Sequence, residues 1–179
     1  MLIDEQKSSL AEVVQSLKDD AVGSKWAQET NKWAIEYAEK LNEVYGDNWY
    51  RGKLPVEMLS DILLPKHGHQ EEKSGGTLLF SLDTSVKDAV ERVKNPPVGY
   101  SSDCLELIIS LKEKIKRDGF TSNIVLAVIN GSLKHVDGLH RMLALKLLVD
   151  EGESIGPIPT FLCDSTRCEQ ANSSSNSVY

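Results

Sequence analysis

Gly138, His140 and Arg141 place a glycine and two basic side chains within one short stretch of the chain. An apolar pattern with helical spacing begins at Leu139, so these residues are predicted to lie on the first turn of a helix. The first N–H groups of a helix lack partners within it, and the helix dipole makes that end positive. Glycine allows close approach of an anion, and the basic side chains add donors. The pattern predicts a phosphate-binding site; the alternative is a capped helix with two solvated basic residues.

Other residue types that carry chemistry are sparse. His67 and His69 could hold a metal ion, but two histidines in a polar, glycine-rich segment without a third ligand are more often solvated. Cys104, Cys163 and Cys168 show neither zinc-site spacing nor a disulfide framework, and an odd number of cysteines cannot all pair within one chain. We therefore interpret them as reduced structural cysteines rather than reactive thiols.

Composition is that of an ordinary globular protein. The chain has 179 residues, of which 40% are hydrophobic and 26% charged, and no apolar run approaches the length of about 20 residues that a membrane span needs. The N-terminus lacks the pattern of a secretory signal, which predicts a cytoplasmic location. A net charge of −7 argues against an extended nucleic-acid surface. Basic residues gather at 112–117 and 134–146, which favours a local patch for a phosphorylated small ligand.

The N-terminal part is predicted to be helical from residue 5 to residue 45, with an interruption at Gly23-Ser24 and an end at residues 46–48. A short helix is predicted at 55–64, with Pro55 in its first turn and Pro65 after its end. The second of the long helices carries an aromatic stripe. Such a stripe is usually a packing face, in the core or on a docking surface. Its members are Trp26, Trp33 and Tyr37.

The second half is predicted to alternate strands and helices. Asn130-Gly131 is a favoured two-residue hairpin turn, because both positions need positive φ. Gly119 is predicted to end the helix that precedes this hairpin, and the segment 170–176 is predicted to be disordered. The predicted strands are 77–82, 124–129, 132–136 and 158–162. The predicted helices begin at Thr84 or Ser85, at Ser102 or Asp103, and near Leu139.

A hairpin followed by Asp-Gly-x-His-Arg at residues 137–141 and an Ala/Leu-rich helix resembles the ParB/sulfiredoxin superfamily. The resemblance covers roughly Thr77 to Asp164. It implies an α+β fold in which a small mixed sheet is flanked by helices. The polar, glycine-rich segment 67–76 marks a domain boundary, and the tail has a low-complexity composition. The predicted organisation is a helical N-terminal extension at 1–76, a nucleotide-binding domain at 77–165 and a disordered tail at 166–179.

Two departures from the family pattern exclude activities that the resemblance would otherwise imply. In sulfiredoxins the catalytic cysteine occupies the position of Leu139, so repair of sulfinic acids is not expected. Chromosome-partitioning members carry a helix-turn-helix after this domain, for which the residues after Asp164 are too few. The chain is most similar to plasmid-encoded fertility-inhibition members, which have ATPase and DNase activity and block DNA transfer by a secretion system.

The resemblance implies a role for each residue of the predicted site. Arg141 would hold phosphate oxygens of ATP through charge-assisted hydrogen bonds. His140 would donate to a phosphate oxygen or move a proton. Gly138 and Leu139 would contribute backbone amides. Asp137 would bind Mg²⁺ together with the phosphates, or would instead cap the helix.

Four further residues are candidates for the predicted site. Ser132 and Lys134 would make additional contacts with the nucleotide. Asp83 and Asp88 are candidate bases, and the alternative for both is a solvated helix start. Phosphoryl transfer depends mainly on positioning and charge stabilisation, so no activated nucleophile is strictly required.

The predicted function is therefore a nucleotide-binding ATPase, with DNA cleavage as a second activity and a protein of a DNA-transfer or secretion apparatus as a partner. DNA cleavage has the weaker basis, because the sequence contains no cluster of carboxylates for metal ions. Two alternatives stay open. One is a non-catalytic inhibitor that docks on a protein through its N-terminal helices, and the other is a kinase for a small molecule such as a free amino acid.

Overall fold

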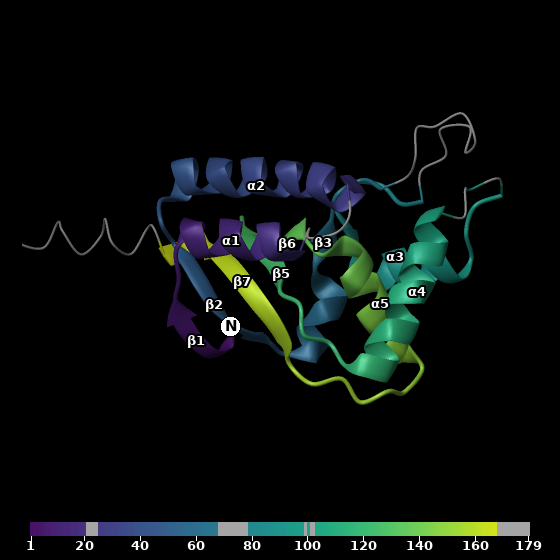
Figure 1. Cartoon of the computed structure of the whole chain (residues 1–179). Helices are drawn as coiled ribbons and strands as arrows, with labels where there is room; N and C mark the ends of the chain where they lie inside the picture. The colour runs from purple at the N-terminus through teal and green to yellow at the C-terminus, as the bar shows by residue number, and fades with distance from the viewer. Residues whose placement is uncertain (21–24, 68–78, 99, 101–102, 168–179) are drawn as a thin grey trace, which may run out of the picture. The chain divides into compact units, whose positions relative to one another are not determined.

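The structure is a computed structural model of the chain, shown in Figure 1. It is a mixed α+β protein, as predicted. No helix in the described part of the chain is both long and apolar enough to cross a membrane. The predicted cytoplasmic location stays a prediction, and the segment predicted to be disordered lies outside the described residues. The structure describes residues 1–20, 25–67, 79–98, 100 and 103–167. For residues 25–30 it describes only the backbone.

The chain forms two compact units, each assembled from separate segments. The first unit contains residues 1–54 and 122–137, together with the described residues from Pro159 on. The second contains the described residues of 55–121 and 138–158. The predicted division at residue 76 does not coincide with the division between these units, because residues 1–54 share a unit with three strands from the second half of the chain.

The first unit is built on strands in the order β1-β2-β7-β5-β6. β5 runs parallel to β7 and antiparallel to β6. Between β5 and β6, Asn130 and Gly131 have φ values of 52° and 76°, which confirms the predicted hairpin turn. The bounds are β1 (Ile3–Lys7), β2 (Trp49–Leu54), β5 (Ile124–Ile129), β6 (Ser132–Asp137) and β7 (Ile158–Asp164).

Helices α1 (Leu10–Asp20) and α2 (Lys25–Tyr45) lie side by side in the first unit (Figure 1). α2 turns a face of small residues, including Ala34 and Ala38, into the core. Small side chains let the helix approach its neighbours closely, so the backbone itself fills space. The buried cluster joins both helices to the strands and consists of Val13, Leu17, Ala34, Ala38, Leu41, Trp49, Val125, Ala127, Val136, Phe161 and Cys163.

The aromatic stripe of α2 is not part of this core. Trp33 is 75% exposed and Tyr37 is 38% exposed, so a core role for these two side chains is wrong. The side chain of Trp26 lies outside the described residues. Val44, 70% exposed, falls on the same helix face as Trp33 and Tyr37. These three exposed apolar side chains share that face with the exposed Lys40, which leaves the docking interpretation of the stripe.

The predicted helix at 5–45 is wrong at its start, where β1 forms, and β2 was not predicted. β1 is an edge strand paired only with β2 in the described sheet, and its residues are mostly exposed, so it lacks an apolar signature. Gly52 permits this pairing, because a Cβ there would lie 2.8 Å from the Ile3 carbonyl oxygen. Gly46, with φ 70°, follows the last residue of α2, so the predicted end of that helix is confirmed.

In the second unit, α5 is the central helix. Its residues Met142 to Leu145 are all fully buried, so α5 is surrounded by protein along much of its circumference. Helices α3 and α4 and the 3₁₀ helix η1 pack against it. The bounds are η1 (Val56–Asp61), β3 (Leu63–Leu64), β4 (Thr84–Ser85), α3 (Val86–Lys94), α4 (Asp103–Asp118) and α5 (Leu139–Asp150).

Two predictions for the second unit need correction. Of the predicted strand 77–82, the described residues form only an isolated bridge between Phe80 and His67, and β4 follows it instead. The segment predicted as a helix at 55–64 forms the short helix η1 and then β3. By contrast, Ser85 caps α3 by accepting a hydrogen bond from the Asp88 amide, as predicted.

Candidate functional site

Helix α5 is preceded by a glycine that is held in a left-handed conformation. Gly138 has φ 97° and ψ 20°, which a side chain would strain, and it is the N-cap of α5. Its carbonyl oxygen accepts a hydrogen bond from the Met142 amide at 2.9 Å. Asp137 is the last residue of β6 and is not the N-cap. The N-cap residue therefore contributes no side chain to the first-turn amides, which is what the predicted phosphate site needs.

The other predicted site residues differ in their surroundings. Leu139 is buried, so its predicted contact with a nucleotide is available only through the backbone. Arg141 follows on the first turn of α5 and is half-buried. Ser132 and Lys134 lie on β6 of the first unit, and their contacts with a nucleotide stay predictions.

His140 instead takes part in a cluster with Cys104 and His67 in the second unit. The Nε2 atom of His140 lies 3.2 Å from the Sγ atom of Cys104. The Nε2 atom of His67 lies 3.0 Å from the same sulfur. The three side-chain atoms all lie within 4.8 Å of one another. Two imidazoles thus converge on one thiol.

Secondary structure holds each member of this cluster. Cys104 is the second residue of α4 and His140 the second residue of α5. His67 is tied to Phe80 by a backbone bridge, in which the His67 amide donates to the Phe80 carbonyl oxygen at 3.1 Å. Its ring stacks on Phe80 with centroids 5.5 Å apart, and meets the His140 ring edge-on at 5.0 Å. The ring of His67 is therefore positioned from two sides.

The thiol lies in a largely water-free environment. Cys104 is only 3% exposed, and burial raises the pKa of its thiol to about 11, while the nearby Tyr100 hydroxyl acts in the opposite direction. Burial also raises the pKa of Tyr100, with Cys104 as a second cause. The Tyr100 hydroxyl oxygen is buried and has no hydrogen-bond partner among the described residues. A thiol in these surroundings is a poor nucleophile.

Two chemical states fit this geometry. A thiol has one hydrogen, so it can donate to one imidazole and accept from the other. Alternatively, the thiolate and the two ring nitrogens could be ligands of one metal ion. Nitrogen and sulfur donors suit Zn²⁺ and other borderline or soft ions, and they do not suit Mg²⁺, which prefers oxygen.

The sequence raised a metal-binding pair of His67 and His69 but favoured two solvated histidines, and His69 lies outside the described residues. The structure gives His67 two other neighbours: Cys104, which lies 37 residues later in the sequence, and His140, which lies a further 36 residues later. Cys104 had been interpreted as structural; Cys104 and Cys163 are indeed buried and without a disulfide, and Cys168 is outside the described residues. No local spacing links the three cluster residues, so only the folded chain brings them together.

The candidate bases lie elsewhere. Asp88 accepts a hydrogen bond from the Ser85 hydroxyl at 2.8 Å while its amide donates back to Ser85, which is a reciprocal cap of α3. This favours the helix-start interpretation of Asp88. Asp83 adopts a positive φ of 58° in the turn before β4, and its role as a base stays a prediction.

The predicted basic patch is largely neutralised by neighbouring carboxylates. On α4, Lys112 pairs with Glu151 at 2.7 Å, and Arg117 pairs with Asp118 at 2.8 Å. Lys146 on α5 pairs with Asp150. Contacts of these side chains with phosphates of DNA would first have to break such pairs, which weakens the case for a nucleic-acid surface here.

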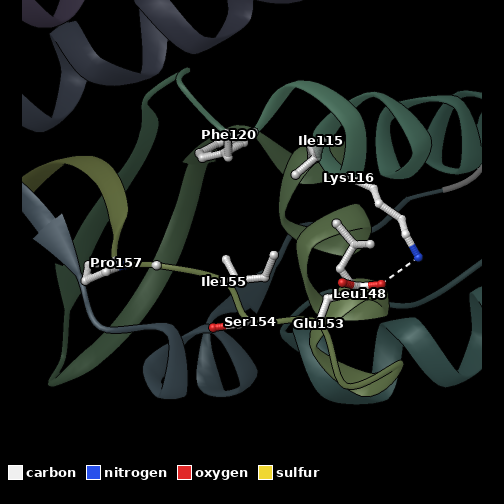
Figure 2. A pocket seen from close by; sticks show the side chains of 10 residues that line it. Ile115, Lys116, Phe120, Leu148, Glu153, Ser154, Ile155 and Pro157 are labelled. Atoms are coloured by element: carbon white, nitrogen blue, oxygen red, sulfur yellow. Dashed lines mark ion pairs between the residues drawn. The ribbon is translucent and has the colours of Figure 1, made fainter.

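A cavity of about 260 Å³ lies near the last turn of α4 (Figure 2). Ile115, Phe120 and Leu148 supply much of its apolar wall, and Lys116 and Glu153 form an ion pair at its rim. None of the residues predicted to bind a nucleotide lines this cavity, and none of the cluster residues does.

Comparison with known proteins adds no relative. Neither a protein-family model, nor a curated protein, nor a solved structure matches the chain. The resemblance to the ParB/sulfiredoxin superfamily therefore stays a prediction from residues 77–164.

Proposed function

We propose that this protein binds a nucleotide such as ATP by its phosphates at the first turn of α5, and hydrolyses it with the help of Mg²⁺. One observation carries the proposal: the N-cap of α5 is Gly138, which has a left-handed conformation and no side chain, so no capping side chain competes with an anion for the first-turn amides. Arg141, on the same turn, would bind phosphate oxygens. Asp137, the preceding residue in the chain, would be the carboxylate ligand of Mg²⁺.

The hydrogen bond of His140 modifies its expected role. Because Nε2 of His140 lies 3.2 Å from the sulfur of Cys104, that nitrogen is occupied in the free protein. Donation from His140 to a phosphate would use the other ring nitrogen or would follow release of Cys104. Arg141 and the backbone amides therefore carry the phosphate-binding part of the proposal.

Replacing Arg141 by alanine should weaken binding of a non-hydrolysable ATP analogue about 10- to 100-fold. A hydrogen bond to a charged group contributes about 1.5–3 kcal/mol, and 1.4 kcal/mol corresponds to a factor of ten. Isothermal titration calorimetry with Mg²⁺ present measures the affinity, and release of inorganic phosphate from ATP measures hydrolysis.

Arg117→Ala is the matched control, since Arg117 is an exposed arginine that pairs with Asp118 at the end of α4. It should bind the analogue like the wild type, and circular dichroism should show that both variants are folded. An unchanged affinity of Arg141→Ala would remove Arg141 from the site. Absence of binding by the wild-type protein would contradict the proposed function itself.

A second function is favoured by a separate observation. The exposed apolar face of α2, formed by Trp33, Tyr37 and Val44, is typical of a surface that docks on another protein. We propose as the alternative function that the chain is a non-catalytic inhibitor of a protein in a DNA-transfer or secretion apparatus, bound through this face. Tryptophan and tyrosine are the side chains that most often dominate such interfaces.

Under this alternative, Trp33→Ser should restore plasmid transfer from donor cells in which the wild-type protein inhibits it. The reason is that an exposed anchor residue would be lost without a change in the core. Lys32→Ala is the control, because Lys32 is a neighbouring exposed residue on the same helix. Transfer frequency is the measurement. Equal inhibition by wild type and Trp33→Ser, or none by the wild type, would rule out docking through this face.

A further inference from the structure

We propose that His67, Cys104 and His140 form a binding site for one Zn²⁺ ion, with a fourth coordination position left for water or a ligand. This proposal does not depend on nucleotide binding, since it concerns other side-chain atoms. It gives the three side chains one shared role, as metal ligands. Neither their positions in the sequence nor the predicted phosphate site explains why they converge.

The distances are close to those of a bound site. Zn–S and Zn–N bonds of about 2.3 and 2.0–2.1 Å in a tetrahedron place neighbouring ligand atoms about 3.3–3.6 Å apart. The two nitrogen-to-sulfur distances of 3.0 and 3.2 Å are slightly shorter. A shift of each imidazole away from the sulfur by a few tenths of an ångström would bring both nitrogen-to-sulfur distances to these values, an adjustment that side chains can make.

The three ligands come from separate elements that hold them in place. Cys104 and His140 are near the first residues of α4 and α5, and those two helices pack against each other. His67 is held by its backbone bridge to Phe80 and by the stacking of its ring. Ligands fixed on rigid elements lose little conformational entropy on binding, which favours affinity.

The donor set selects the ion. One thiolate and two imidazoles favour Zn²⁺, Co²⁺ or copper over Mg²⁺ and Ca²⁺. Structural zinc sites have four protein ligands, whereas catalytic sites commonly have three and keep a fourth position open. The three-residue set found among the described residues therefore corresponds to the open type of site.

Tyr100 is the second observation that points to this place. Its hydroxyl lies near Cys104 and is buried, and no hydrogen bond of normal geometry pairs it among the described residues. Buried hydroxyls are seldom left unpaired. A thiolate bound to zinc, or a water molecule bound to the ion, would give this hydroxyl an acceptor. Hydrogen bonds of this kind commonly orient and tune metal ligands.

The test measures metal binding by the full chain without nucleotide. Protein freed of metal with a chelator is titrated with Co²⁺, whose bonds to thiolate absorb in the near ultraviolet, and Zn²⁺ affinity is measured by competition with a chromophoric chelator. We expect one ion per chain and a thiolate-to-cobalt band. Loss of an outer hydrogen-bond partner weakens metal sites about 10- to 100-fold, so loss of a direct ligand in Cys104→Ala should cost about 100-fold or more.

Cys163→Ala is the matched control, because Cys163 is also a buried cysteine without a disulfide and it lies in the first unit. It should retain the band and the affinity of the wild type. His67→Gln supplies a second variant in case Cys104→Ala does not fold, and it should bind Zn²⁺ about 100-fold more weakly. No thiolate-to-cobalt band in the wild type, or an undiminished band in Cys104→Ala, would overturn the proposal. Neither result bears on Arg141 and ATP, whose binding is measured separately.

Discussion

Replacing Trp49 by alanine is expected to lower the free energy of unfolding by about 3–5 kcal/mol. Trp49 is the first residue of β2 and is fully buried in the core cluster of the first unit, against side chains of both helices and three strands. Its indole Nε1–H donates to the Asn42 side-chain oxygen at 3.2 Å. The substitution would leave a cavity and an amide oxygen without its donor.

Trp33→Ala is the matched control, since it removes the same side chain from an exposed position of α2. Trp33 is 75% exposed, so its loss should change the free energy of unfolding by no more than about 0.5 kcal/mol. Urea denaturation followed by circular dichroism measures both variants. Equal losses for the two variants would contradict the assignment of Trp49 to the core and of Trp33 to the surface.

These two tryptophans also show what could not be predicted about the helices from the sequence, namely which face of α2 is buried. The amphipathic pattern located α2, but two neighbouring faces of that helix carry apolar residues, one aromatic and one formed largely by alanine. The larger side chains favour the aromatic face for burial by area alone. Close approach of the backbone instead favours burial of the face that carries Ala34 and Ala38. The residues that pack against α2 decide which of the two faces is buried, and these residues are distant in sequence.

Elements marked by local signals were predicted well. Positive φ at Asn130-Gly131, the Ser85 cap and the glycine after α4 all depend on a few neighbouring residues, and each was located correctly. β1 depends instead on a partner strand more than 40 residues away, and the edge position lets its side chains stay polar. The points at which the chain passes from one unit to the other likewise have no local sequence signal.

The candidate site divides in the same way. The stretch 137–141 could be predicted as an anion site because its residues are contiguous in the sequence, at one strand end and one helix start. The cluster of His67, Cys104 and His140 needs three elements of the second unit to pack before it exists. Each of its members therefore had an ordinary local interpretation as a solvated histidine, a structural cysteine or a phosphate donor.

If the cluster binds Zn²⁺, the ion joins three segments of the second unit that are distant in the sequence. A ligand that binds only the folded state stabilises it by RT ln(1 + [L]/Kd), which is about 4 kcal/mol at a free ion concentration of 1,000 times Kd. Unfolded chains also bind zinc weakly through cysteine and histidine, so this figure is an upper value. Mg²⁺ should give no comparable effect, because the donors are nitrogen and sulfur.

For a chain of this length, about 4 kcal/mol corresponds to a rise of about 8–16 °C in Tm. We therefore expect wild-type protein in excess Zn²⁺ to unfold at a temperature higher by up to this amount than protein kept in a chelator. Cys104→Ala and His67→Gln should show little of this rise, while Cys163→Ala should show all of it. An equal rise in all four proteins would assign the stabilisation to zinc bound elsewhere, because only the first two variants remove ligands of the proposed site.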